Sequence, residues 1–166
     1  MAPLKKIKSP IRWLSEGNIH LTVKFLGEIS PSLCGQIEKR LLEPPLPIRP
    51  FTLVIRGLGK FAHGDVPSVI WAGIEANESL HALFRQIEQR LALLGLERDR
   101  RDFTPHITLG RNKSHADFAV LGETLAAKVA TSIAECHVAH IHLVKSQLTS
   151  GGPIYTILKE IPLAPA

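Results

Sequence analysis

Two histidines of this chain each stand two residues before a threonine. His20 and Thr22 lie in the stretch NIHLTVKFLG, and His106 and Thr108 lie in TPHITLGR. Imidazole has a pKa of about 6.5, so it can accept or donate a proton near neutral pH. Two imidazoles on opposite sides of a phosphorus atom could therefore catalyse an in-line displacement, in which one takes a proton from water and the other protonates the departing alkoxide.

The threonines fit the same chemistry. Side chains at positions i and i+2 of a strand point to one face, so each motif would present an imidazole beside a hydroxyl. The hydroxyls of Thr22 and Thr108 can donate hydrogen bonds to non-bridging phosphate oxygens, where negative charge grows in the transition state. Neither motif contains the carboxylate pair that commonly holds a metal ion. We therefore expect an active site with no metal and no cofactor.

Phe25 and Arg111 follow the two histidines at the same spacing. In an ideal strand this spacing puts Arg111 on the face opposite His106, so a role in phosphate binding requires the strand to end or bulge at Gly110. A solvated arginine is the alternative. Phe25 could stack against a nucleic-acid base, or it could be an ordinary core phenylalanine.

The offset between the two motifs aligns much of the rest of the chain, so each half reads as a motif strand, a helix and two more strands. In the first half we predict a strand over Asn18–Phe25. A helix should follow it, with Ser30 as N-cap and Pro31 at its first position. The stretches FTLVIRGL and VIWAGI predict the next two strands.

In the second half we predict a strand over His106–Arg111, a helix over about Asp117–Ala130, and strands in AECHVAHIHLVKSQL and PIYTILKEI. Between the halves, NESLHALFRQIEQRLALLGL has the apolar stripe of an amphipathic helix, capped by Asn77 and ended by Gly95. The same offset places the counterpart of one strand and most of one helix ahead of the first residue. We infer that a symmetric parent fold has lost them here.

The 166 residues suffice for one domain, with lobes built from about 12–76 and 77–166. The net charge of +5 and the pI near 9.5 favour anionic partners such as RNA. No apolar run approaches the roughly 20 residues that span a bilayer, so we expect no membrane association. The two distant cysteines are typical of reduced thiols in the cytoplasm.

A second group of histidines occurs in HVAHIH, where His140 and His142 share one face of a predicted strand. This spacing could hold zinc, but no cysteine or carboxylate cluster in the sequence completes the site. We therefore expect partly exposed histidines and no metal. The arginines of LERDRRDF, just before the second motif, either form a solvated loop or steer an RNA backbone by charge.

The stretches HLTVKFLG and FTPHITLGR resemble the paired signatures of the two-histidine (2H) phosphoesterases. The resemblance is greatest to the RNA 2′,3′-cyclic phosphodiesterases, also called 2′-5′ RNA ligase-like or LigT-like proteins. Further matches in IRWLSEGNIHLTVKFLGEI, RDFTPHITLGR and LVKSQLTSGGPIYTIL extend it from Arg12 to Leu158. It implies an α+β fold that is bilobal and pseudo-twofold, with two antiparallel sheets lining a central cleft and helices outside.

The resemblance also implies an activity, the hydrolysis of a terminal 2′,3′-cyclic phosphate on RNA to a 2′-phosphate. The implied site residues are His20, His106, Thr22, Thr108, Arg111 and Phe25. The first histidine resembles the acid that protonates the leaving 3′-oxygen, and the second resembles the base that activates water. The threonines and Arg111 resemble phosphate contacts, and Phe25 resembles the residue that stacks on a base. A pseudo-twofold site can be read in either direction, so the acid and the base could exchange roles.

Three alternatives stay open at this point. The same histidines could join a 2′,3′-cyclic phosphate end to a 5′-hydroxyl end in a 2′-5′ linkage. The chain could bind RNA ends without catalysis, or it could act on a small cyclic nucleotide. In each RNA case the expected partner is the phosphate-bearing 3′ end of RNA, bound by a monomer in the cytoplasm.

Overall fold

The computed structural model describes residues 11–63, 66–112, 132–150 and 152–164. Its elements in chain order are β1 (Ile11–Trp13), the 3₁₀ helix η1 (Glu16–Asn18), α2 (Pro31–Leu42), β2 (Phe51–His63), β3 (Val66–Ile74), α3 (Glu78–Ala92), β4 (His106–Asn112), β5 (Ser132–Val138), β6 (His140–Thr149) and β7 (Gly152–Pro162). The helix predicted over about Asp117–Ala130 lies outside the described residues.

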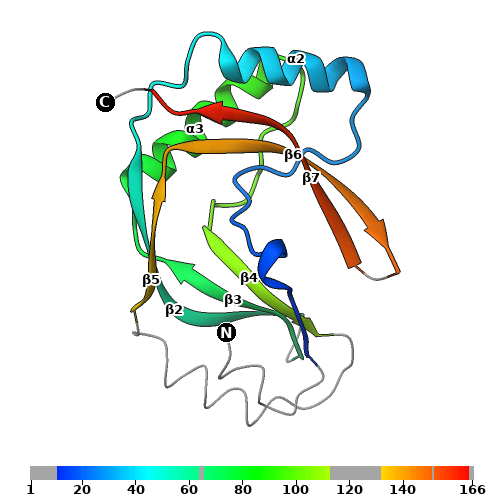
Figure 1. The fold of residues 1–166 in the computed structure, drawn as a ribbon, viewed down its shortest axis with the longest axis vertical. Helices are drawn as coiled ribbons and strands as arrows, with labels where there is room; N and C mark the ends of the chain where they lie inside the picture. The colour runs from blue at the N-terminus through cyan, green and yellow to red at the C-terminus, as the bar shows by residue number, and fades with distance from the viewer. Residues whose placement is uncertain (1–10, 64–65, 113–131, 151, 165–166) are drawn as a thin grey trace. The chain divides into compact units, whose positions relative to one another are not determined.

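The strands form two sheets, as the α+β prediction required (Figure 1). The larger sheet has the order β1-β4-β3-β2-β5, and the smaller is the β6-β7 hairpin. The pairings of β1 with β4, β2 with β3, β3 with β4 and β6 with β7 are antiparallel. In the large sheet β4 lies between β1 and β3, so both of its edges carry partners. This central place matters because β4 begins with the second motif.

The described residues divide into two compact units that alternate along the chain. Of the described residues, the first unit contains 11–22, 54–63, 66–75, 105–112 and 132–135, and the second contains 23–53, 76–104, 136–150 and 152–164. The chain thus crosses between units several times, whereas the sequence prediction divided it once near residue 76. Both histidine motifs, from His20 to Thr22 and from His106 to Thr108, belong to the first unit.

Each unit has its own apolar core. In the first, Ile11, Leu58, Ile70, Ala72 and Leu109 are buried on one face of the large sheet. In the second, the core draws on both helices and the hairpin, with members that include Ile37, Leu83, Leu91, Leu143 and Ile161. The first core includes Leu109 of β4 and so anchors that strand, and the second core includes Leu143 and Ile161 and so anchors the β6-β7 hairpin.

Helix α2 begins and ends where the sequence predicts. The Ser30 hydroxyl accepts a hydrogen bond from the Leu33 amide at 3.2 Å, and Pro31 occupies the first turn, where a missing N–H costs nothing. The helix ends at Leu42, because the prolines that follow cannot continue it.

Helix α3 also agrees with its prediction. Asn77 accepts from the Leu80 amide at 3.0 Å, and Gly95 follows the helix at a φ of +81°, a conformation that costs glycine little. From the last turn, the guanidinium of Arg90 donates to the carbonyls of Pro44 and Pro45. This tie fixes the proline-rich segment after α2 against α3. Neither helix, nor any other in the described part of the chain, has the length and apolar character that crossing a membrane requires.

Two strand predictions were wrong in extent. Asn18–Phe25 is not a strand, because η1 takes its first residue and Leu21 alone forms a bridge. The segment passes into the second unit at Val23, which ends any pairing with the large sheet. The single strand predicted in AECHVAHIHLVKSQL is broken at Ala139, so that β5 joins the large sheet and β6 joins the hairpin.

Candidate active site

The two motifs meet at one antiparallel bridge, between Leu21 and Ile107. Two segments of the chain pair with the same edge of β4, one after the other. β1 pairs with its far end, the Leu14 amide donates to the Leu109 carbonyl at 2.9 Å, and Leu21 takes the near end. The first motif therefore lies alongside the second motif in the first unit.

This register determines how the polar side chains face each other. In an antiparallel bridge, His20 lies opposite Thr108, and Thr22 lies opposite His106. Side chains on either side of a paired position point away from the side chain at that position, so this register favours one face for all four polar groups and the other face for Leu21 and its partner. Opposite positions have Cβ atoms about 4.5–5.5 Å apart, a spacing at which the groups could contact one small anion.

A backbone carbonyl contacts one ring nitrogen of His20 and orients the imidazole. Its Nδ1 lies 2.8 Å from the carbonyl oxygen of Asn18. A carbonyl oxygen can only accept, so Nδ1 carries a proton and donates it. The exchangeable position is therefore Nε2, on an imidazole ring that is exposed to solvent.

His106 has a different environment, because aromatic rings pack around it. The ring of Phe61 meets it edge-on with centroids 4.8 Å apart, and the ring of Trp71 lies at 6.3 Å. Both rings come from neighbouring strands β2 and β3 of the same sheet. Packing of this kind restricts the imidazole to few orientations.

A β-bulge interrupts β4 just after the second motif. Ile70 of β3 pairs with Gly110, but the next residue, Trp71, pairs with Thr108. Leu109 is therefore an extra residue on β4, and it reverses the alternation of side chains beyond it. For Arg111 to reach the face of His106, the strand has to end or bulge near Gly110, and the bulge lies at the preceding residue.

The bulge brings Arg111 to the face of His106. Arg111 pairs with Val69, and His106 pairs with Gly73 on the same strand, an even number of residues away. Partners that share parity on β3 share a face, so the guanidinium projects to the side that carries the imidazole and the hydroxyls. Arg111 is exposed there.

Arg12 is a candidate site residue that the sequence analysis did not single out. It pairs with Arg111 across β1 and β4, so the two exposed guanidinium groups project from adjacent strands on the same face. Like charges directly opposite each other in a sheet repel, which an anion bound between them would relieve. Only the strand register reveals this pair, because the two residues are distant in the sequence.

Phe25 lies in the second unit, beyond the point where the chain leaves the first. The residue is 83% exposed, so it is not a core phenylalanine. The other five predicted residues all belong to the first unit.

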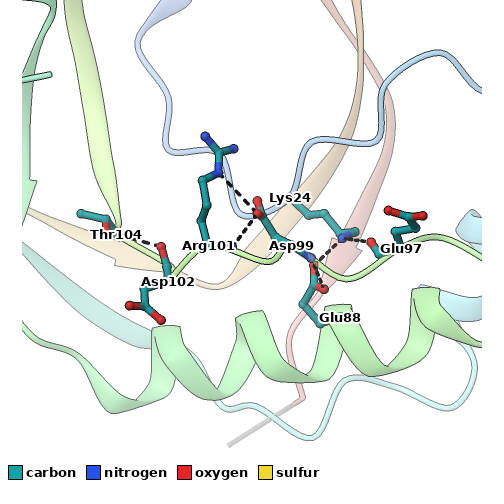
Figure 2. Close-up of polar contacts among 7 residues, drawn as sticks. All are labelled: Lys24, Glu88, Glu97, Asp99, Arg101, Asp102 and Thr104. Atoms are coloured by element: carbon teal, nitrogen blue, oxygen red, sulfur yellow. Dashed lines mark hydrogen bonds and ion pairs between the residues drawn. The ribbon is translucent and has the colours of Figure 1, made fainter. Parts of the chain in front are cut away.

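A buried ion pair holds the segments that adjoin both motifs (Figure 2). The Nζ of Lys24, just after the first motif, donates to Glu88 of α3 at 2.5 Å and to the Glu97 carbonyl at 2.9 Å. The second carboxylate oxygen of Glu88 accepts from the Asp99 amide at 3.1 Å. Each charged side chain of the pair is 8% exposed.

The segment before the second motif has two further supports. The backbone N–H of Arg101 donates to the Asp99 carboxylate and lowers the pKa of that carboxyl below its usual range. Phe103 stacks flat on Phe84 of α3 with centroids 4.3 Å apart. Together with Glu88, these contacts fix the loop that ends at the second motif.

The chain belongs to the 2′-5′ RNA ligase superfamily, whose family model matches residues 14–149. A protein of Methanocaldococcus jannaschii named RNA 2′,3′-cyclic phosphodiesterase is 33% identical over 150 residues, which cover 90% of this chain and 83% of the relative. A protein of the same name from Aquifex aeolicus is 34% identical over 154 residues, 92% of this chain and 81% of the relative.

Solved structures support the same family. The crystal structure of TT0787 of Thermus thermophilus matches with a TM-score of 0.79 and 26% sequence identity. The match covers 98% of this chain and 88% of the TT0787 chain. The structure of Escherichia coli LigT complexed with 3′-AMP matches with a TM-score of 0.74 and 25% sequence identity. The match covers 93% of this chain and 82% of the LigT chain. The predicted 2H phosphoesterase family and α+β fold are thereby confirmed.

Proposed function

We propose that this chain hydrolyses the terminal 2′,3′-cyclic phosphate of RNA to a 2′-phosphate, without a metal ion. Water attacks the phosphorus, the bond from phosphorus to the 3′-oxygen breaks, and the product keeps the phosphate on the 2′-oxygen. One imidazole takes the proton from the attacking water, and the other gives a proton to the departing 3′-oxygen. His20 and His106 take these two roles, with His20 as the acid in the assignment by family resemblance.

The observation that carries this proposal is the bridge between Leu21 and Ile107. Its register supports a site in which two imidazoles and two hydroxyls share one face in a twofold pattern, the arrangement that an in-line displacement would use. The hydroxyls of Thr22 and Thr108 donate hydrogen bonds to the non-bridging oxygens, and this stabilises the charge of the transition state. The names of the curated relatives support the same reaction.

Charge on the same face supports an anionic substrate. The guanidinium group of Arg111 reaches this face through the bulge, and that of Arg12 projects beside it. Guanidinium groups bind phosphate oxygens in a bidentate manner, so they would hold the cyclic phosphate or the next phosphate of the RNA chain. Phe25, with its ring exposed, is proposed to stack on a base.

The decisive assay is turnover of an oligonucleotide with a 2′,3′-cyclic phosphate end in the presence of EDTA. We expect a 2′-phosphate product, and a fall in kcat of roughly 10²–10⁴-fold in both His20→Ala and His106→Ala. His137→Ala is the matched control, because His137 is an exposed histidine outside both motifs. Circular dichroism should give the same fold content for all variants. Undiminished turnover by either motif variant would contradict the proposal.

The reverse reaction is the second candidate, favoured by the name of the superfamily. Microscopic reversibility allows the same two imidazoles to activate a 5′-hydroxyl in place of water. Supplying both RNA ends and measuring 2′-5′ linked product against 2′-phosphate distinguishes ligation from hydrolysis. A non-catalytic RNA-end-binding protein would give neither product, and its affinity would survive the loss of either histidine.

A further inference from the structure

The β6-β7 hairpin (Figure 1) is remote in sequence from both motifs, and three of its side chains have ligand atoms that lie close enough together to hold a metal ion. His140 and His142 alternate along β6, and Glu160 of β7 pairs directly with His142. No metal was predicted here from the sequence, because no cysteine or carboxylate cluster accompanies these histidines in the chain. Glu160 supplies a carboxylate, and only the register of the hairpin brings it there.

The donor atoms converge on one point. The carboxylate oxygen Oε2 of Glu160 lies 3.2 Å from Nε2 of His142 and 3.7 Å from Nε2 of His140. One donor atom from each residue lies within 4.8 Å of the other two. A tetrahedral zinc ion with bonds near 2.0–2.1 Å holds its ligands about 3.4 Å apart, so small side-chain rotations suffice to form the site.

The backbone that carries these ligands is fixed from the opposite face. Leu143 and Ile161, which alternate with the ligands, are buried in the core of the second unit. A site on a strand pair held in this way is preorganised, and less ordering is needed when the ion binds.

We propose that His140, His142 and Glu160 form a zinc-binding site. Two imidazole nitrogens and one carboxylate oxygen supply three ligands, and solvent supplies the fourth, because all three side chains are exposed. Imidazole is a poor ligand for calcium or magnesium, which prefer oxygen donors, so the site selects zinc over those ions. The bound ion links β6 to β7 and stabilises the hairpin. This proposal does not depend on the proposed RNA chemistry.

The test is a titration of the full-length, tag-free chain with zinc chloride, after treatment with EDTA and removal of the chelator. Competition with a chromophoric chelator measures affinity and stoichiometry. We expect one zinc per chain, and at least a tenfold loss of affinity in His140→Ala, His142→Ala and Glu160→Gln, because even the loss of a residue that only orients a ligand costs about 10–100-fold. His137→Ala, which alters a neighbouring exposed histidine, should bind as the unmodified chain does.

Thermal unfolding gives a second readout. Zinc should raise the Tm of the unmodified chain and of His137→Ala, should leave the Tm of Glu160→Gln unchanged, and magnesium chloride should have no effect. Because the three ligands are exposed, their variants should keep the fold, which circular dichroism checks. Unaltered zinc affinity in His142→Ala, or a Tm shift that persists in Glu160→Gln, would assign the ion to other groups and overturn the proposal. The same holds if the unmodified chain binds less than one equivalent.

Discussion

Replacing Lys24 by methionine should destabilise the protein strongly, although the proposed reaction gives this side chain no role. The Lys24 ammonium and the Glu88 carboxylate each belong to a side chain that is 8% exposed. Methionine preserves most of the apolar volume but leaves the carboxylate buried with one donor, the Asp99 amide. Removing one partner of a buried ion pair costs about 3–5 kcal/mol, so we expect a loss of that size in the free energy of unfolding.

Equilibrium urea unfolding, followed by far-UV circular dichroism, measures this loss. The double variant Lys24→Met/Glu88→Leu should recover most of it, because an apolar pair of similar volume can replace a buried ion pair at little cost. Arg85→Met is the matched control, since Arg85 forms an ion pair with Glu78 in which both side chains are largely exposed. That variant should unfold as the unmodified chain does.

The same substitution should loosen the loop before the second motif, because the Lys24 ammonium also donates to the carbonyl of Glu97. This loop contains Arg98, Arg100 and Arg101, so trypsin can report on it. We expect faster tryptic cleavage there in Lys24→Met than in the Arg85→Met control, under conditions in which both are folded. A loss of stability below about 1 kcal/mol, or additive effects in the double variant, would refute the coupling argued here.

Three other substitutions test the site and its supports. Arg111→Lys would remove the bidentate phosphate contact proposed for the guanidinium group, so it should lower kcat/KM for the cyclic-phosphate oligonucleotide by roughly 10–100-fold, while circular dichroism stays unchanged. Gly59→Ala would drive a methyl group into the ring of Trp71, so the aromatic packing around the second imidazole must shift and the measured kcat should fall. Gly35→Ala, inside α2 with nothing within 4 Å of the new methyl, should raise the free energy of urea unfolding by about 0.5–1 kcal/mol; a decrease would contradict the helix assignment.

Both helices could be predicted from the sequence because their signals are local. Ser30 and Asn77 cap helices a few residues away, and prolines or glycine end them. The segment Asn18–Phe25 alternates like a strand, yet it forms a single bridge, because its next polar residue is bound by α3 in the other unit. The contact between Lys24 and Glu88 joins residues far apart in the chain, so it leaves no periodic pattern in the sequence. Alternation alone therefore predicted a strand where the structure has only one bridge.

The site residues divide in the same way. The histidine and threonine pairs are candidates from their own spacing, whereas the position of Arg111 depends on a bulge that only the pairing with β3 reveals. Arg12 and Glu160 were not predicted as candidates, because each lies beside the other candidate residues only through the pairing of two strands. Register depends on how whole strands pack against the cores beneath them, and a single sequence does not record it.

The two motifs have the same residue types but different surroundings, and this bears on their roles. His106 begins a strand that is paired on both edges, and aromatic rings confine its imidazole. His20 stands beside a single bridge, is exposed, and is oriented by a backbone carbonyl at Nδ1. Two chemically identical groups can serve as acid and base in one turnover when their environments differ. The asymmetry of the sheet, rather than any difference in the motifs, would therefore supply the physical basis for the unequal roles proposed for the two histidines.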